Sequence, residues 1–286
     1  MKKGLSMRAR HNLEGWSFVL LWAVGFLLFM AIPLARSLIY SFQDLKVSTE
    51  GLIPTNVGLK HFRHAFVLDV DFVPNLITTF MSIIVEVPLI LIFAIFISML
   101  LNRNFIGRSL FRGIFFLPVI ITSGAVLQKL KDNGAETLPI FSQYNLFVKL
   151  VEFIPRDILF PMLGILDSLT VVMWDSGVQI LIFLAGLQAI SVSLYEAAKC
   201  DGATPWESFW KITFPMLIPM IFVNVLFSIM NSFTKADNLV MEQIKTVFKA
   251  SNYGYASALG WIYFVLTFVL IGIVVFIFRR SLGERG

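Results

Sequence analysis

The chain has 286 residues, of which 57% are hydrophobic and 14% are charged, so it is far more apolar than an ordinary soluble domain. Its formal charge of +5 comes from basic residues scattered among apolar segments, without the sustained basic stripe of a nucleic-acid-binding protein. The single cysteine, Cys200, excludes an intrachain disulfide framework and any cysteine-based zinc or iron–sulfur site within the chain. The composition therefore indicates an integral membrane protein that binds no nucleic acid.

Six segments have the roughly 20 mostly apolar residues that a helix needs to cross a bilayer. They are residues 16–38, 76–101, 110–127, 172–190, 214–233 and 256–278. The basic start of the chain leads into the first segment and no small-residue cleavage site follows, so we expect an uncleaved first span. The pattern predicts an all-α integral membrane protein with six transmembrane helices in a single domain, residues 1–286.

Charge predicts the orientation, because Lys and Arg are denser in cytoplasmic segments. Six spans place both termini on one side, and with the N-terminus inside, the inner segments hold 12 of the 23 basic residues but only 5 of the 18 acidic ones. The outer connections, 39–75 and 128–171, are longer and near neutrality. We therefore predict an N-in/C-in topology, with an amphipathic piece at 144–154 lying at the membrane interface or on the outer mouth.

The inner loop between the fourth and fifth spans, 191–215, carries signals for a first short helix. Ser193 and Glu196 have the spacing of a capping box, in which each side chain satisfies a free backbone N–H, so a helix is expected to begin at Leu194. Gly202 stands where this helix must end, because glycine adopts the left-handed conformation without a Cβ clash.

A second short helix is predicted directly after the glycine. Thr204 is a capping residue, Pro205 is tolerated at the first helical position, and Glu207 completes another capping box. Two short helices should therefore meet at a bend at Gly202. An ordinary cytoplasmic connection with good caps would show the same local features.

The spacing of this loop is more specific than its caps. Glu196-Ala197-Ala198, Gly202, Ile212 and Phe214-Pro215 strongly resemble the EAA loop of permease subunits in binding-protein-dependent ABC importers, with Phe214 where leucine is usual. The resemblance implies that Glu196, Ala197, Ala198 and Gly202 couple the permease to its ATPase. Small side chains at Ala197 and Ala198 would allow close approach of the ATPase, and a side chain at 202 would obstruct the bend.

The resemblance extends beyond this loop to the carbohydrate branch of the family, close to maltose-type permeases. It covers residues 58–66, 75–79, 100–118 and 177–190, whereas the outer segment 129–170 matches least.

The resemblance implies a type I ABC importer permease fold in the cytoplasmic membrane of a prokaryote. It also implies a second permease subunit, which we expect to be non-identical, two ATPase subunits, and an extracytoplasmic binding protein that delivers the sugar. The chain has no G-x-x-x-x-G-K-[ST] phosphate loop, so ATP and Mg are expected on the ATPase subunits. We expect no cofactor in this chain and no enzymatic activity of its own.

Polar residues in the fifth span indicate a substrate path. Asn224, Ser228, Asn231 and Lys235 recur at steps of four, three and four, which places them on one helical face. Such residues either line a path or hold helices together, and both interpretations stay open for Asn224.

The resemblance implies that the sugar site is lined by Ser228, Asn231, Ser232, Lys235, Trp174, Asp175 and Val178. Amides and carboxylates pair with sugar hydroxyls, and an indole covers a pyranose ring. Lys235 would suit an acidic sugar, or it snorkels at the membrane boundary.

Glu86 is a carboxylate near the middle of the second span, with Thr78 and Ser82 on the same face and Pro88 just beyond. It is expected to pair with a partner subunit or stay protonated, and substrate contact stays open. Alternative functions are a secondary transporter that uses Glu86 as proton carrier, an ABC importer permease for a non-sugar substrate, and a membrane-embedded enzyme built on Glu86 and Asp175.

The outer loop before the second span carries His61, His64, Asp69 and Asp71. The two histidines share a helical face but have no evident third ligand, so no metal site is expected. The two aspartates are predicted to be solvated.

Overall fold

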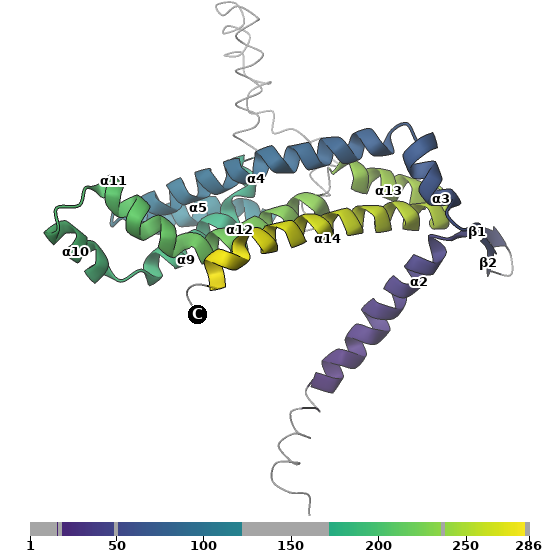
Figure 1. Ribbon diagram of the computed structural model, residues 1–286, viewed down its shortest axis with the longest axis horizontal. Coiled ribbons are helices and arrows are strands. Elements are labelled where there is room, and N and C mark those ends of the chain that lie inside the picture. Colours follow the sequence, from purple (N-terminus) through teal and green to yellow (C-terminus); the bar gives the residue numbers. More distant parts are fainter. Residues whose placement is uncertain (1–15, 17–18, 49–50, 122–171, 236–237, 284–286) are drawn as a thin grey trace, which may run out of the picture. The chain divides into compact units, whose positions relative to one another are not determined.

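The computed structural model describes residues 16, 19–48, 51–121, 172–235 and 238–283 (Figure 1). These residues form helices and one hairpin, grouped in two compact units. The first unit comprises Met1–Phe80 and Phe233–Leu270, and the second comprises Met81–Ser232 and Ile271–Gly286. The helical class is confirmed, whereas the hairpin was not predicted.

The first unit begins with the helix Val19–Tyr40, which contains the π-helical turn η1 (Leu27–Ala31) and α2 (Ile32–Tyr40). A hairpin follows, in which β1 (Gln43–Ser48) pairs antiparallel with β2 (Gly51–Asn56) and Gln43 lies opposite Asn56. The other elements of the first unit are α3 (Lys60–Arg63), the π-helical turn η2 (His64–Leu68), the start of α4 (Phe72–Asn102), α13 (Leu239–Lys249) and α14 (Tyr253–Gly283) as far as Leu270. The predicted outer connection 39–75 is therefore a folded structure.

Asp69 is the centre of a hydrogen-bond network in this unit, so the prediction of a solvated loop is wrong for this residue. Its carboxylate accepts hydrogen bonds from Tyr255 Oη at 2.5 Å, from Gln243 Nε2 at 3.0 and 3.1 Å, and from the backbone N–H of Phe72 at 3.0 Å. Burial of the Asp69 carboxyl works to raise its pKa, but these hydrogen bonds to the ionised form outweigh it and lower the pKa below its ordinary value. The network joins the start of α4 to α13 and α14.

His61 is also more enclosed than an outer loop suggested. It is 7% exposed, and its Nε2 lies 3.1 Å from the Gln43 carbonyl oxygen. Gly254 allows the approach of α14, because a Cβ there would collide with the same Gln43 oxygen. Within the described residues, no group of three metal-ligating side chains comes together.

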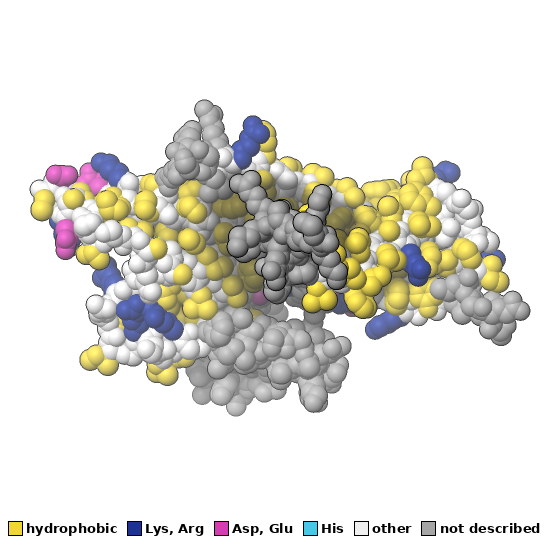
Figure 2. Space-filling view, turned by 90° about the horizontal axis from the view of Figure 1, so that it is seen from below, with side chains coloured by type: hydrophobic (Ala, Val, Ile, Leu, Met, Phe, Trp, Pro, Cys, Tyr) yellow, Lys and Arg dark blue, Asp and Glu magenta, His cyan; other side chains and the backbone are white. Residues whose placement is uncertain are grey.

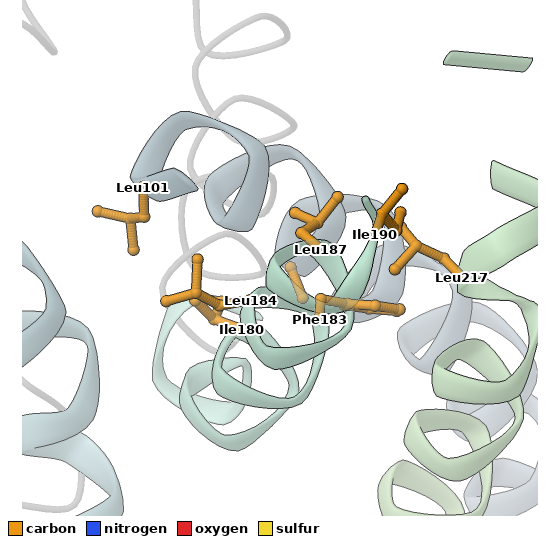
Figure 3. Packing of buried hydrophobic residues seen from close by; sticks show 8 residues of the cluster. Leu101, Ile180, Phe183, Leu184, Leu187, Ile190 and Leu217 are labelled. Atoms are coloured by element: carbon orange, nitrogen blue, oxygen red, sulfur yellow. The ribbon is translucent and has the colours of Figure 1, made fainter. Parts of the chain in front are cut away.

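The second unit contains the rest of α4, α5 (Arg108–Ile121), α9 (Gly177–Ala189), α10 (Val192–Cys200), α11 (Pro205–Ser208), the π-helical turn η3 (Phe209–Thr213), most of α12 (Phe214–Thr234) and the end of α14. Figure 3 shows its core, in which α9 residues meet side chains of α4 and α12. The core consists of Ala94, Leu101, Ile180, Phe183, Leu184, Leu187, Ile190 and Leu217. Gly186 permits close packing of α9 on α12, since a Cβ there would lie 2.6 Å from Met220 Cγ.

Apolar side chains also cover much of the surface, as Figure 2 shows. In the first helix, for example, Leu21 is 80% exposed and Phe29 is 84% exposed. A surface of this kind fits lipid as solvent.

Among the described residues, four helical stretches are long and apolar enough to cross a membrane: Val19–Tyr40, Phe72–Asn102, Pro205–Lys249, which includes α12, and Tyr253–Arg279. The pair α9 and α10, bent by 63°, makes a fifth if it is one span. The predicted span 110–127 corresponds to α5 up to Ile121, and its remainder lies outside the described residues, as do the outer segment 129–170 and the amphipathic piece within it. Six spans and their orientation stay predictions.

Candidate functional site

A buried polar cluster joins α9 to α12 in the second unit. Gln179 and Asn224 are 0% exposed and Ser228 is 1% exposed. Gln179 Nε2 donates to Ser228 Oγ at 2.9 Å, and Asn224 Nδ2 donates to the Gln179 backbone oxygen at 3.4 Å. These side chains therefore do link the two helices.

The same cluster keeps unused hydrogen-bonding capacity. Among the described residues, neither Gln179 Oε1 nor Asn224 Oδ1 accepts a hydrogen bond, although both atoms are buried. An unsatisfied buried acceptor costs ~1–3 kcal/mol, so such groups normally have a protein, water or ligand partner. Two buried amide oxygens in one cluster thus have no hydrogen-bond donor among the described residues.

Gln179 was not singled out from the sequence. The available signal was an amide within the apolar segment 172–190, one residue after the predicted site residue Val178. Its partner Ser228 lies 49 residues away, so only the fold reveals that they meet.

The other residues predicted to line the substrate path lie just before α9, in its first turn, and in the last turns of α12. Trp174 and Asp175 are partly buried in a helical turn before α9, and Val178 is partly buried in the first turn of α9. In α12, Asn231 is partly buried and Ser232 is 7% exposed.

The polar face predicted for the fifth span, from Asn224 to Lys235, ends earlier than expected. The buried polar residues Asn224, Ser228 and Ser232 recur at steps of four, but α12 ends at Thr234, so Lys235 lies just beyond the helix and belongs to the first unit. The prediction that Lys235 shares the helical face is wrong, because the helix stops before it.

Glu86 is partly buried in the second-unit part of α4, as is Ser82, whereas Thr78 is exposed. The helix continues through Pro88. The role of Glu86 stays a prediction.

The bent helix pair consists of α10 and α11. The start of α11 agrees with the prediction, whereas the start of α10 differs from it. α10 begins at Val192 after Ser191, with no side-chain cap, and Ser191 Oγ lies 2.7 Å from Ser193 Oγ. The predicted capping box of Ser193 and Glu196 is therefore wrong: the helix starts two residues earlier, which places Ser193 inside it.

The end of α10 and the start of α11 follow the prediction. Gly202 has φ +78°, its N–H donates to the Lys199 oxygen at 3.1 Å, and the Ala203 N–H donates to the Ala198 oxygen at 2.9 Å, which is a Schellman motif. Thr204 and Glu207 form the expected capping box, with Glu207 N–H donating to Thr204 Oγ1 at 3.3 Å.

The two arms of this loop are held together, and the predicted coupling residues face outward. Tyr195 Oη lies 2.9 Å from Thr213 Oγ1, which connects α10 to η3. Glu196, Ala197 and Gly202 are exposed, and Ala198 is partly buried. Acidic side chains gather at the end that carries α10 and α11 (Figure 2).

A side chain at 202 would obstruct the bend through the backbone conformation that Gly202 adopts, and not through a collision with this chain. A Cβ at Gly202 has no atom within 4 Å, so the constraint within the chain is its positive φ alone. The space outside Gly202 is left for another molecule or solvent.

Comparisons with known proteins identify the family to which the polar cluster and the bent helix pair belong. Residues 70–285 match a family model described as "Binding-protein-dependent transport system inner membrane component". The chain is 33% identical to the "Probable ABC transporter permease protein YesP" of Bacillus subtilis (strain 168), over 98% of this chain and 94% of that protein. It is 27% identical to the "Multiple sugar-binding transport system permease protein MsmF" of Streptococcus mutans serotype c, over 91% of this chain and 92% of that protein.

A solved structure supports the fold. The chain is similar, with a TM-score of 0.63 and 18% identity, to a chain of a bacterial alginate ABC transporter in complex with an alginate pentasaccharide-bound periplasmic protein. The likeness covers 97% of this chain and 98% of that chain. At this identity it shows the fold alone.

Proposed function

The chain belongs to the family of inner membrane components of binding-protein-dependent transport systems, and we propose that it is a permease subunit of an ATP-driven importer that translocates a carbohydrate. The observation that carries the carbohydrate assignment is the buried cluster of Gln179, Asn224 and Ser228 with its two unused amide oxygens.

Sugar hydroxyls match this cluster chemically. Each hydroxyl donates one hydrogen bond and accepts others, and the cluster offers two amide acceptors in surroundings where hydrogen bonds are stronger than in water. The relative MsmF is named as a multiple sugar-binding transport system permease, which supports the same substrate class. An oligosaccharide is the preferred substrate, and Lys235 would suit an acidic one.

The proposed assembly has a second, non-identical permease, two ATPase subunits that hold ATP and Mg, and an extracytoplasmic binding protein. In it, six spans run N-in/C-in through the prokaryotic cytoplasmic membrane. Glu196, Ala197, Ala198 and Gly202 are proposed to contact the ATPase, and three of them, Glu196, Ala197 and Gly202, are exposed on the bent pair. ATP-driven closure of the ATPases would move this pair and reorient the two permeases.

The substrate path is tested by a matched pair of serine variants in the reconstituted transporter. Ser228→Ala removes a hydroxyl that accepts from Gln179 across two helices, whereas Ser98→Ala removes an equally buried hydroxyl that donates only to Ile95 in its own helix, at 2.8 Å. We expect sugar uptake to fall or its KM to change in Ser228→Ala and to stay unchanged in Ser98→Ala. Equal uptake in wild type and both variants contradicts the proposed path.

Coupling of the permease to its ATPase is tested with variants of two glycines, Gly202 and Gly58. Both have a positive φ, and a Cβ at either position has no atom within 4 Å. Asn tolerates the left-handed conformation, so Gly202→Asn adds a side chain with little strain, and Gly58→Asn, at φ +57°, is its control. Co-purification with the ATPase and sugar-stimulated hydrolysis should be lost in Gly202→Asn and kept in Gly58→Asn. Uptake that proceeds without ATP, with no ATPase bound to the wild type, overturns the importer assignment.

A further inference from the structure

Two arginines at the start of α5 share a single neutral partner on α9. With its side-chain oxygen turned toward them, Gln188 accepts from Arg108 Nη2 at 3.1 Å and from Arg112 Nη2 at 3.0 Å. Arg108 Nη1 also donates to Asn104 Oδ1 at 3.1 Å. Two guanidinium groups are thus held side by side by amide oxygens that carry no charge.

This pair has no anionic partner within the described part of the chain. The described residues place no carboxylate within ion-pair distance of either arginine, and the Nε atoms of Arg108 and Arg112 are buried without a hydrogen-bond acceptor. Like charges four residues apart on a helix repel, and a partly buried unpaired charge is unfavourable. An external anion that accepts from both guanidinium groups would remove both costs.

The surroundings of the pair are apolar and exposed. Ile106, two residues before Arg108, is 103% exposed, and Phe111, next to Arg112, is 46% exposed. A soluble anion would gain nothing from such neighbours, whereas a phospholipid places its acyl chains on them and its phosphate on the cations.

We propose that Arg108 and Arg112, held by Gln188, form a binding site for the phosphate of an anionic phospholipid. Guanidinium groups suit this ligand because their forked N–H donors match phosphate oxygens. The site shares no residue with the cluster around Gln179 or with the bent loop, and it does not depend on the transported substrate.

The experiment is native mass spectrometry of the full-length chain in detergent with equal amounts of phosphatidylglycerol and phosphatidylcholine. The wild type should retain phosphatidylglycerol preferentially, and Arg108→Gln/Arg112→Gln should lose about fivefold in retention for each arginine, which corresponds to ~1 kcal/mol per cation. Lys245→Gln/Lys249→Gln is the matched control, because these exposed cations have the same spacing on α13, and it should keep the preference.

Three outcomes overturn the proposal. The first is equal retention of the two lipids by the wild type, which needs no variant and so holds even if the double variant misfolds. The second is unchanged phosphatidylglycerol retention in a folded Arg108→Gln/Arg112→Gln protein. The third is complete displacement of the lipid by excess inorganic phosphate, which would identify a site for a soluble anion.

Discussion

Gly186→Ala should weaken the contact between α9 and α12, although alanine is the better helix former. The added Cβ would lie 2.6 Å from Met220 Cγ and 3.0 Å from a methyl group of Leu217. Carbon atoms in favourable contact lie ~3.5–4.0 Å apart, so at least one neighbour must move. Leu217 is 0% exposed and belongs to the core, so the partly buried Met220 side chain is the neighbour that shifts more easily.

The expected loss of stability in Gly186→Ala follows from two opposing effects. Overpacking a core costs ~1–3 kcal/mol, while replacing glycine by alanine inside a helix gains up to ~1 kcal/mol. Gly272→Ala on α14 isolates the gain, because a Cβ at Gly272 has no atom within 4 Å. The two variants should therefore differ by ~1–3 kcal/mol, with Gly186→Ala the less stable.

Thermal unfolding in detergent measures this difference when both variants are heated at the same rate. At roughly 2–4 °C per kcal/mol, the Tm of Gly186→Ala should lie about 2–12 °C below that of Gly272→Ala. Met220→Ala should relieve the clash, so the loss caused by Gly186→Ala becomes smaller in that background. Equal Tm values for the two glycine variants, or no relief from Met220→Ala, would refute the argument from packing.

Three further predictions concern hydrogen-bonded side chains. Thr204→Ala should weaken the start of α11 by ~1 kcal/mol through loss of the capping box, seen as faster amide exchange at residues 205–208, and unchanged exchange would count against it. Tyr195→Phe should weaken the link to Thr213 by ~0.5–1.5 kcal/mol and so raise amide exchange in α10, and unchanged exchange in α10 would contradict it. Because hydrogen bonds from Tyr255 and others lower the pKa of Asp69 in the folded state, its contribution to stability is present above the unfolded value of about 3.9 and is lost as pH falls through the lower folded value. Asp69→Asn should therefore be less stable than wild type near neutral pH and converge with it in strong acid, as followed by Tm against pH; a constant difference would contradict this.

Features that depend on neighbours in sequence were predictable. The apolar segments correspond to helices wherever the structure describes them, and the Gly202 bend with its Thr204 cap follows from residues within a few positions of each other. The failed capping box at Ser193 shows the limit of local signals. Serine is a common N-cap residue at both 191 and 193, but the backbone is extended at Ile190 and Ser191, where the chain turns by 63° between α9 and α10, so Ser191 takes the N-cap position.

Features that depend on distant partners were not predictable. Asp69 meets Gln243, 174 residues away, and Tyr255, 186 residues away, so its loop position suggested solvent. Gln179 was visible as an amide in an apolar segment, but such a residue has no identifiable role until its partner on α12 is known. In both cases the sequence shows a polar group that needs a partner without showing which group supplies it.

The arrangement of α9 limits how the bent loop can act on the polar cluster. Gln179 lies two turns before Gly186 on this helix, a rise of ~10 Å, and α10 follows directly after its C-terminal end. Because Gly186 packs closely on α12, a displacement of α10 that is passed to α9 must carry α12 with it. In the proposed importer the bond between Gln179 and Ser228 would then survive the motion, and access to the cluster would change by movement of the α9–α12 pair against other helices or subunits, not by separation of these two helices.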